Sequence, residues 1–327
     1  MKNPILKDTF REIKKTKSRF FSIFAIVAIG VAFFAGIFAS APTMRYNADK
    51  YFDDYNLMDY RILSNFGLTD DDIEEIRQIE GVEGVQPAYS VDVLVNDGQS
   101  QKVMRVHSLS SNHMKQEDPD YINQLIVVEG RLPSKEGEIV VEKTQMLENS
   151  FKVGTQISLN SGTSDPISDS LNTDTFTIVG IVETPYYLSF QKGSSSIGSG
   201  SLGCYGYVLD TNFNMEVYTE AFLTIQGAKQ WNSYEDEYFD YLQPSTQRLE
   251  TLGIERSSIR KEEILDEVLE EYNKGLKEYE EAVSEFDEEI KKAEKELEDA
   301  DKELLKGEMT LQNNRDLTNL RFEMAQQ

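Results

Sequence analysis

The stretch FFSIFAIVAIGVAFFAGIFASA, from Phe20 to Ala41, determines how the rest of the chain is interpreted. It contains no charged residue, and as a helix at ~1.5 Å per residue it reaches ~33 Å, enough for the ~30 Å hydrocarbon layer of a bilayer. The stretch therefore predicts a transmembrane helix. Residues 1–19 hold seven basic and two acidic residues. By the positive-inside rule we expect residues 1–19 in the cytoplasm and everything after residue 41 outside the cell membrane.

The alternative for this stretch is a cleaved secretory signal, because Ala39-Ser40-Ala41 has the small-x-small pattern of a processing site. Signal peptides, however, carry an apolar region of only ~7–15 residues. Pro42 also follows the supposed cleavage point directly. These features favour a retained anchor over a cleaved signal.

Charge and cysteine content limit what the outer part can do. The net charge is −25, and since the first nineteen residues contribute +5, the remaining residues carry −30. Such an acidic surface repels nucleic acid and anionic headgroups, which excludes both as ligands of the outer part. Cys204 is the only cysteine, so no intrachain disulfide is possible and packing alone must hold the outer domain together.

The N-terminal segment 2–19 predicts a short helix with one apolar stripe, formed by Leu6, Phe10 and Ile13, among basic residues. Such helices serve either as anchors on acidic lipid or as handles for a cytoplasmic partner. The residues do not separate these two uses.

The segment after the apolar stretch predicts an α+β domain, because strands mix with a few helices without regular βαβ alternation. Thr69 and Asp72 are spaced for a capping box that opens a helix with Ile73, Ile76 and Ile79 on its buried face and Gly81 at its end. Further helices are expected at 142–150 and 234–242. Strands are expected at 56–64, 82–95, 102–109 (after an Asn96-Asp97-Gly98 turn), 125–129, 138–141, 155–159, 176–182, 205–209 and 221–225.

The glycine- and serine-rich run 191–206 lacks the Lys-Ser/Thr ending of a phosphate-binding P-loop, so we expect a mobile surface loop there. Tyr234, Tyr238 and Tyr241 share one side of their predicted helix and are expected in the core or a groove.

From Ser258 onward a seven-residue apolar repeat predicts a coiled-coil helix extending to Leu320. A lone helix with this seam would expose a long apolar stripe, so it needs a returning helix of the same polypeptide or another chain. The chain stops at Gln327 without a clear return, which indicates a longer polypeptide. The predicted seam residues are Leu269, Leu276, Val283, Ile290, Leu297, Leu304 and Leu311, with Leu265, Tyr272, Tyr279, Phe286, Ala293, Ala300 and Gly307 four residues earlier in each repeat.

The predicted organisation has four parts: a cytoplasmic basic helix (1–19), a transmembrane helix (20–41), an extracytoplasmic α+β core domain (42–252) and a coiled coil (253–327). No catalytic constellation is recognisable. His107 and His113 are six residues apart at a strand end and in a loop, without HExxH, Cys-x-x-Cys or GxSxG motifs. We therefore expect no catalytic, cofactor-binding or metal-binding residues and no enzymatic activity.

Several segments together resemble the FtsX-like permeases of ABC transporters, the mechanotransmission type related to the exporter MacB. The opening LKDTFREIKKTKSRFFSIFAIVAIGVAFFAGI is similar to that family's basic helix followed by its first transmembrane helix. FTIVGIVETPYYLSF and the loop after it are similar to a later strand and loop. GRLPSKEGEIVVEK resembles the signature turn of the extracytoplasmic core domain, with Gly130, Arg131, Pro133, Gly137 and Glu138.

The resemblance implies a permease subunit that needs no cofactor and works with a separate cytoplasmic ATPase, membrane lipid and a second permease copy or half. Its outer domain would export a peptide or lipid-like substrate or control an exterior enzyme, and its coiled coil would contact an extracytoplasmic protein. The family has four transmembrane helices, and this chain shows one. The alternative is a single-pass anchored coiled-coil adaptor or receptor without transport activity.

Overall fold

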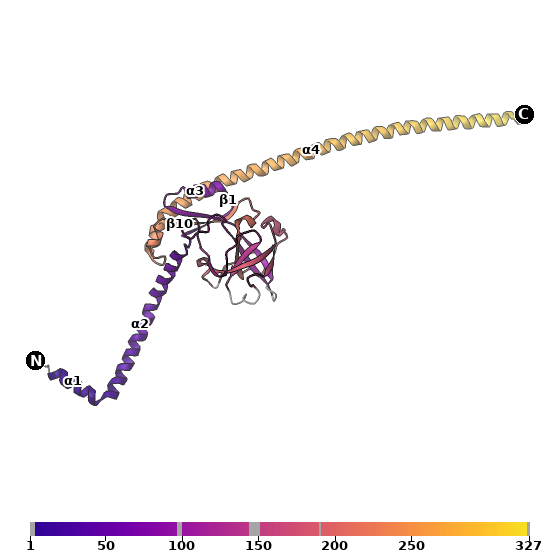
Figure 1. Ribbon diagram of the computed structural model, residues 1–327. Helices are drawn as coiled ribbons and strands as arrows, with labels where there is room; N and C mark the ends of the chain where they lie inside the picture. Colours follow the sequence, from indigo (N-terminus) through magenta and orange to yellow (C-terminus); the bar gives the residue numbers. More distant parts are fainter. Residues whose placement is uncertain (1–3, 97–99, 144–150, 190, 326–327) are drawn as a thin grey trace. The chain divides into compact units, whose positions relative to one another are not determined.

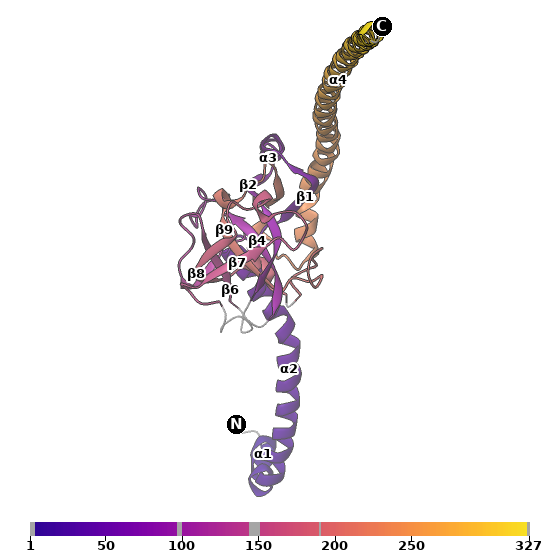
Figure 2. The same cartoon turned by 90° about the vertical axis from the view of Figure 1, so that its right-hand side faces the viewer.

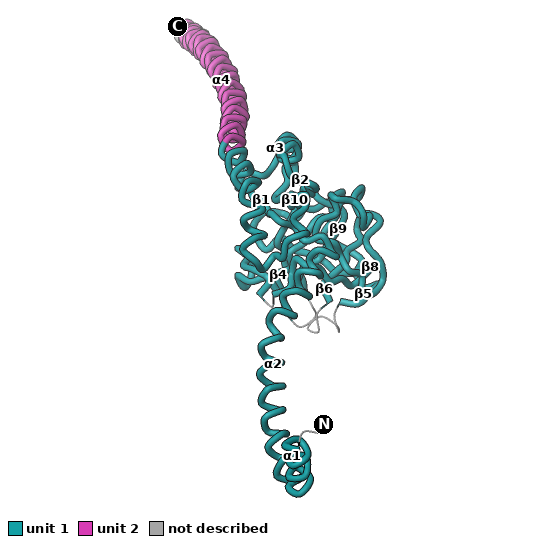
Figure 3. The backbone as a smooth tube through the Cα atoms, turned by 90° about the vertical axis from the view of Figure 1, so that its left-hand side faces the viewer, with its two compact units in different colours: residues 1–254 teal, residues 255–327 magenta. Residues whose placement is uncertain are grey.

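The computed structural model describes residues 4–325, apart from 97–99, 144–150 and 190. The chain divides into two compact units, Met1–Ile254 and Glu255–Gln327 (Figure 3). Unit 1 contains the N-terminal helices, all the strands and the first turns of the last helix. Unit 2 contains the remainder of that helix.

Two helices form the N-terminal part of unit 1. They are α1 (Pro4–Lys15) and α2 (Lys17–Asp54), with a break at Thr16 (Figure 1). Helix α2 is long and apolar enough to cross a membrane, and its apolar side chains are exposed. The expected span 20–41 lies within it, and the helix continues through Pro42 for about three more turns.

A three-stranded antiparallel sheet, sheet A, has the order β1-β10-β2, formed by Tyr60–Leu68, Tyr218–Ile225 and Val82–Ala88. The short helix α3 (Asp70–Arg77) packs its buried Ile73 and Ile76 against this sheet. The predicted capping box is confirmed, since the Thr69 hydroxyl accepts a hydrogen bond from the Asp72 N–H and the Asp72 carboxylate accepts one from the Thr69 N–H. The helix ends at Arg77, earlier than expected, and Gly81 follows at φ +96°.

A seven-stranded sheet, sheet B, has the order β5-β8-β6-β9-β4-β3-β7. Figure 2 labels β4, β6, β7, β8 and β9 of this sheet. Because β8 also pairs with β7, the strands from β8 through β7 close into a small barrel. Large apolar side chains such as Phe176, Met104 and Ile178 fill its interior. The strands are β3 (Ser90–Asn96), β4 (Gln101–Leu109), β5 (Ile126–Gly130), β6 (Glu138–Glu142), β7 (Gln156–Asn160), β8 (Thr175–Glu183) and β9 (Cys204–Leu209). Single 3-10 turns occur at η1 (Ile167–Asp169), η2 (Pro185–Tyr187), η3 (Asp210–Asn212) and η4 (Ala228–Gln230).

The α+β class is confirmed, but two predicted strands are wrong in extent. The run 82–95 is two strands in different sheets, because the chain leaves sheet A at Tyr89. There the Tyr89 N–H donates to the Ser108 hydroxyl at 2.8 Å, and the Ser90 N–H donates to the Thr219 hydroxyl at 2.7 Å. The run 56–64 becomes a strand only from Tyr60, since Asn56 takes a left-handed backbone (φ +51°) that interrupts the extended conformation at the start of the run.

The last helix, α4 (Asp236–Ala325), is continuous over 90 residues. The expectation of a separate helix ending at residue 242 is wrong. Pro244 removes one backbone hydrogen bond, which costs about 3 kcal/mol in an isolated helix. Burial of Leu242 and Ser245 against sheet A and the chain after it offsets that cost. The predicted helix 142–150 lies largely outside the described residues, with its first residue, Glu142, in β6. Of the predicted turn 96–98, Asn96 is the last residue of β3 and the other two residues lie outside the described part of the chain.

The glycine- and serine-rich run is packed in part, which corrects its description as a surface loop. Ile197 and Leu202 are buried against Val103, and Ser194 and Ser201 form a β-bridge across the run. The two apolar side chains of this run, Ile197 and Leu202, pack on Val103 of β4 and hold the loop there. The glycine- and serine-rich composition of the run does not indicate this packing.

Candidate functional site

The C-terminal end of α2 contacts the chain that leads into α4. The Asp49 carboxylate accepts a hydrogen bond from the Ser233 N–H at 2.7 Å. The Phe52 ring stacks on Tyr234, with 6.1 Å between ring centroids. Just past the helix, the Lys229 ammonium donates to the Asn56 side-chain oxygen at 2.8 Å. A hydrogen bond, a stacked ring pair and a hydrogen bond from a lysine ammonium thus hold the C-terminal end of α2 and Asn56 to residues 229–234.

The first turns of α4 are bound in turn to the start of β1. The Tyr238 hydroxyl donates to the Asp59 carboxylate at 2.5 Å, and the Tyr60 hydroxyl donates to the Leu242 carbonyl at 2.9 Å. The second Asp59 oxygen accepts from the Ile225 N–H at 2.6 Å. Burial raises the pKa of Asp59, while these hydrogen bonds act in the opposite direction. We call the contacts of residues 49–60 with residues 225–246 the root junction.

A second polar cluster lies between the two sheets. Arg61 on β1 donates to the Glu220 carboxylate of β10 at 2.6 Å, and His107 Nδ1 on β4 lies 3.4 Å from the other Glu220 oxygen. His107 Nε2 is 2.7 Å from the Tyr187 hydroxyl. Burial opposes ionisation of Glu220, but His107 and Arg61 outweigh it and lower its pKa. We call these four residues the inter-sheet cluster. The cluster joins sheet A to the barrel through the Glu220 side chain, which has no exposed surface.

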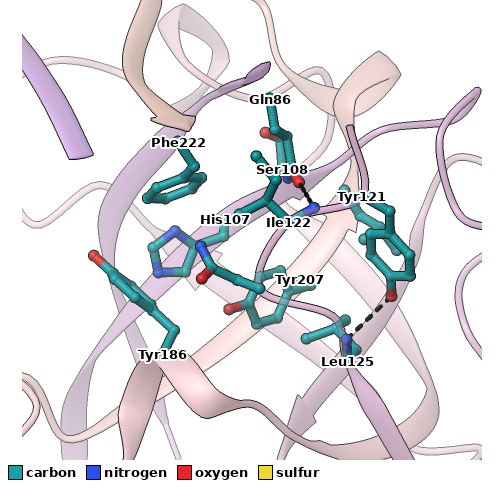
Figure 4. Close-up of a pocket in the computed structure, with 11 residues that line it drawn as sticks. Gln86, His107, Ser108, Tyr121, Ile122, Leu125, Tyr186, Tyr207 and Phe222 are labelled. Atoms are coloured by element: carbon teal, nitrogen blue, oxygen red, sulfur yellow. Dashed lines mark hydrogen bonds between the residues drawn. The ribbon is translucent and has the colours of Figure 1, made fainter. Parts of the chain in front are cut away.

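The cavity beside this cluster is small, about 10 Å³, which is close to the space of one water molecule. Aromatic side chains surround it, and two of the hydrogen bonds at its wall are the Ile122 N–H to the Gln86 side chain and the Leu125 N–H to the Tyr121 hydroxyl (Figure 4). A pocket of this size does not admit a transport substrate. The site therefore has the features of a joint between sheets.

The predicted signature turn connects β5 to β6 around one ion pair. Arg131 makes two hydrogen bonds to the Glu138 carboxylate, at 2.7 and 2.5 Å, and the Ser134 N–H donates a third at 2.9 Å. Together with desolvation, which acts in the opposite direction, these bonds lower the pKa of Glu138 to about 2, with the Arg131 hydrogen bond as the largest cause. Gly130 has φ +76°, and a Cβ there would lie 2.2 Å from the Val179 carbonyl oxygen.

Gly137 completes the turn at φ +74°, and its N–H donates to the Asn212 side chain at 2.9 Å. Pro133 is buried between these two glycines. The structure thus brings Gly130, Arg131, Pro133, Gly137 and Glu138 into one compact turn against β8 and η3. The geometry explains why glycine and a charged pair occur at these positions.

One group of possible metal ligands lies in the described residues, where His113, Asp118 and Asp120 have ligand atoms within 4.8 Å of one another. The His113 ring is 2.8 Å from the Asp118 carboxylate. The Asp120 oxygens accept hydrogen bonds from Arg77 and from the Val85 N–H. These carboxylates already have hydrogen-bonding partners, and the group ties the 110–120 loop to sheet A.

Comparison with known proteins identifies the family. The family described as the MacB-like periplasmic core domain matches residues 21–226, more than half of the chain. The chain belongs to this family. The family is that of MacB/FtsX-like ABC transporter permeases, whose members work with cytoplasmic ABC ATPases, and this chain carries one candidate membrane helix, α2, among its described residues.

Two solved structures are similar to parts of the chain. The extracellular domain of the noncanonic ABC-type transporter YknZ from Gram-positive bacteria is 13% identical, with a TM-score of 0.32, and the match covers 51% of this chain and 78% of that chain. The periplasmic region of MacB from Actinobacillus actinomycetemcomitans is 13% identical, with a TM-score of 0.28, covering 56% of this chain and 75% of that one. A search of curated proteins found no match.

Sequence analysis located the signature turn but missed the two polar clusters. It placed Tyr234, Tyr238 and Tyr241 on one helix side in the core or a groove, but α4 begins only at Asp236, and Tyr234 and Tyr241 are exposed. The partners of Tyr234 and Tyr238 in the root junction are about 180 residues earlier in the chain. It considered His107 only as a metal ligand or a catalytic residue and expected neither role. The structure shows that its partners, Glu220 and Tyr187, come from other elements.

Proposed function

We propose that this chain is a permease subunit that couples ATP hydrolysis by a separate cytoplasmic ATPase to movement of its extracytoplasmic domain. The root junction is the observation that carries the proposal. It joins the only candidate membrane span of the described residues to the start of α4 through contacts made by Asp49, Phe52, Asp59 and Tyr60. A displacement of the outer end of α2 would reach α4 and sheet A through these contacts.

The junction is suited to carrying force because its contacts are short and directional and are made at several points. Asp59 alone links Tyr238 of α4 and Ile225 of β10. Packed elements with hydrogen-bonded contacts move as bodies more readily than they deform. A tilt or shift of α2 is thus expected to move sheet A and the root of α4 together relative to the barrel. The inter-sheet cluster is the joint about which they move, and it transfers part of the motion to the barrel.

The signature turn is proposed to keep the barrel rigid during this motion. Gly130, Arg131, Pro133, Gly137 and Glu138 tie the β5–β6 connection to the middle of β8 and to η3, so the entry to β6 is fixed against its neighbours. The work performed outside would be export of a peptide or lipid-like substrate or control of an exterior enzyme. The inter-sheet cavity itself, at about 10 Å³, is too small to hold either kind of substrate.

The proposed topology places residues 1–19 in the cytoplasm and residues after 41 outside. In this arrangement α1 presents its exposed Ile5, Leu6 and Phe10 to the inner leaflet or to a cytoplasmic partner, with lysines along the same helix. Cysteine labelling in intact cells tests the orientation, since Cys204 is fully buried and gives low background. Ser195→Cys should react with an impermeant maleimide and Thr9→Cys only after lysis; the reverse pattern would contradict the topology.

Co-purification tests the function. The native chain, extracted from its own membranes in mild detergent, should bring down a protein with Walker motifs and vanadate-sensitive ATPase activity, together with a second permease copy or half. The double variant Asp49→Ala, Tyr238→Phe, which removes two contacts of the root junction, should retain the complex but weaken coupling. Coupling is measured as transport, or as regulation of the exterior partner, per ATP hydrolysed. Recovery of the chain without any ATPase would instead support the single-pass adaptor or receptor.

A further inference from the structure

Unit 2 exposes one apolar face along its whole length. The seam side chains defined above are 41% exposed at Leu276 and 72% exposed at Leu311, and the other large ones lie within this range. From Leu265 onward every helical residue whose burial is described is exposed. Heptad apolar faces of this length are normally covered by another helix, since isolated stripes of large apolar residues are rare in soluble surroundings.

The positions that border this seam carry a single sign of charge. In a heptad coiled coil two kinds of position beside the seam face the partner helix and select it. Here they are the residue after each member of the series Leu265 to Gly307 and the residue before each member of the series Leu269 to Leu311. Between residues 265 and 311 nine of these fourteen bordering positions are acidic and none is basic. The nine are Asp266, Glu280, Asp287, Glu289, Glu294, Glu296, Asp301, Glu303 and Glu308; the other five are Val268, Asn273, Gly275, Ala282 and Thr310.

The lysines of the same segment all lie on the opposite side of the helix. They occupy the three heptad positions that point away from the seam, where two of them form ion pairs within the helix: Lys277 with Glu281 at 3.8 Å and Lys302 with Glu298 at 2.8 Å. The seven lysines are Lys274, Lys277, Lys291, Lys292, Lys295, Lys302 and Lys306. Positive charge is present in this helix but is absent from the border of its apolar face.

This segregation argues against a second copy of the segment as the occupant. In a parallel pair Glu289 would face Glu294 of the other copy, and Glu296 would face Asp301, since bordering positions five residues apart meet across the seam. In an antiparallel pair acidic positions would again face acidic positions. Like charges at these positions disfavour a pairing and are a common means of excluding wrong partners.

We propose that the seam binds a helix with apolar heptads bordered by lysine or arginine, supplied by a polypeptide segment other than 265–311 itself. The seam also sets the partner's shape. Its side chains change from Tyr272, Tyr279 and Phe286 to Ala293, Ala300 and Gly307, so the partner needs its larger residues opposite the small end. Charge sign and size gradient together specify a heterotypic coiled coil, and the inference does not depend on the proposed transport function.

Binding of designed peptides to the full chain in detergent micelles tests this proposal. Two labelled peptides of about five heptads share the same seam residues, with large side chains opposite the small end, and carry either lysine or glutamate at all bordering positions. Fluorescence anisotropy should show the lysine peptide binding more tightly by on the order of 100-fold, since each exposed charge pair adds a modest increment and several act together. A third peptide, with the lysines kept and seam residues replaced by serine, should not bind; if it binds as well, the attraction is non-specific charge and the proposal is wrong.

Charge reversal on the chain separates the bordering positions from net charge. Glu289→Lys, Glu296→Lys and Glu303→Lys together change three of the nine acidic bordering positions and should strongly reduce the preference for the lysine peptide. The matched control, Glu267→Lys, Glu281→Lys and Glu288→Lys, changes net charge equally on the outer side and should keep the lysine preference. Equal behaviour of the two triple variants would overturn the proposal. So would a stable dimer of the unaltered chain, seen by sedimentation in detergent and abolished by Val283→Asp.

Discussion

The two sheets of unit 1 differ in what holds them together. In the seven-stranded sheet B, fifteen buried apolar side chains among the described residues form one cluster inside the barrel, with Phe176 and Met104 fully enclosed. In the three-stranded sheet A the buried apolar side chains of the described residues are divided among three smaller clusters, of six, three and three, and polar contacts through Asp59, Tyr60 and Glu220 add to them. Apolar packing is non-directional, whereas hydrogen bonds fix particular pairs of atoms. We therefore expect the barrel to move as one rigid body and sheet A to connect it to the long helices.

The difference explains where the long helices attach. Both the end of α2 and the root of α4 contact residues in or next to sheet A. Sheet A is expected to open locally at a lower free energy than the barrel, because it has fewer buried apolar contacts. Elements that move during function generally lie in regions of low local stability.

The largest expected effect is on the barrel. Phe176→Ala removes a fully buried ring, which should lower the free energy of unfolding by about 4 kcal/mol. Denaturant unfolding of the full chain in detergent measures this. Phe66→Ala, at a ring that is 61% exposed, is the matched control and should change stability by less than about 0.5 kcal/mol. Equal losses in the two variants would show that the barrel core is not the dominant source of stability.

The inter-sheet cluster should give the next largest effect. Glu220→Gln removes the buried carboxylate that faces Arg61 and His107, and breaking such a pair should cost about 3 kcal/mol. Glu129→Gln, at an exposed position of β5, should be nearly neutral. Amide exchange is the sharper measurement, since protection should fall in both sheets if the cluster joins them. Loss confined to sheet A would contradict the proposed transfer to the barrel.

The root junction should show a smaller and local effect. Tyr238→Phe removes the 2.5 Å hydrogen bond to Asp59 and should reduce stability by about 1.5 kcal/mol. Hydrogen exchange should accelerate in the first turns of α4 and at Ile225, and stay unchanged in β6 and β8. Tyr279→Phe, at an exposed position of unit 2, serves as the control. Uniform acceleration across unit 1 would mean that the junction does not open separately.

The smallest effect concerns pH and the signature turn. The pKa of Glu138 is lowered from 4.5 to about 2, so its ionised form stabilises the fold above about pH 4.5, and this contribution is lost as pH falls toward 2. Arg131→Leu should remove most of the loss between these pH values, measured by thermal unfolding across that range. Arg248→Leu breaks an ion pair with an exposed Glu80 and should leave the acid dependence unchanged. Identical pH profiles for all three proteins would contradict this role.

The sequence predicted the elements well where local signals decide them. Hydrophobic length located α2, the Thr69–Asp72 spacing predicted a capping box, and most barrel strands were found within one or two residues. The strand break at Tyr89 and the helix through Pro244 were missed, because both depend on partners distant in the chain. The root junction and the inter-sheet cluster were missed for the same reason, since the partners in each are distant in the chain. The seam was visible from its repeat, but its partner remains a prediction.

The central claim is that the outer end of α2 and the root of α4 move together. Spin labels on Arg45→Cys with Glu250→Cys, and on Arg45→Cys with Ser158→Cys, allow double electron–electron resonance in the native complex trapped with ADP or with ATP and vanadate. The account predicts that the distance distribution of the first pair stays the same between the two states, while that of the second pair, which reaches the barrel, shifts. A change in the first pair as large as in the second, or no change in either, would contradict it.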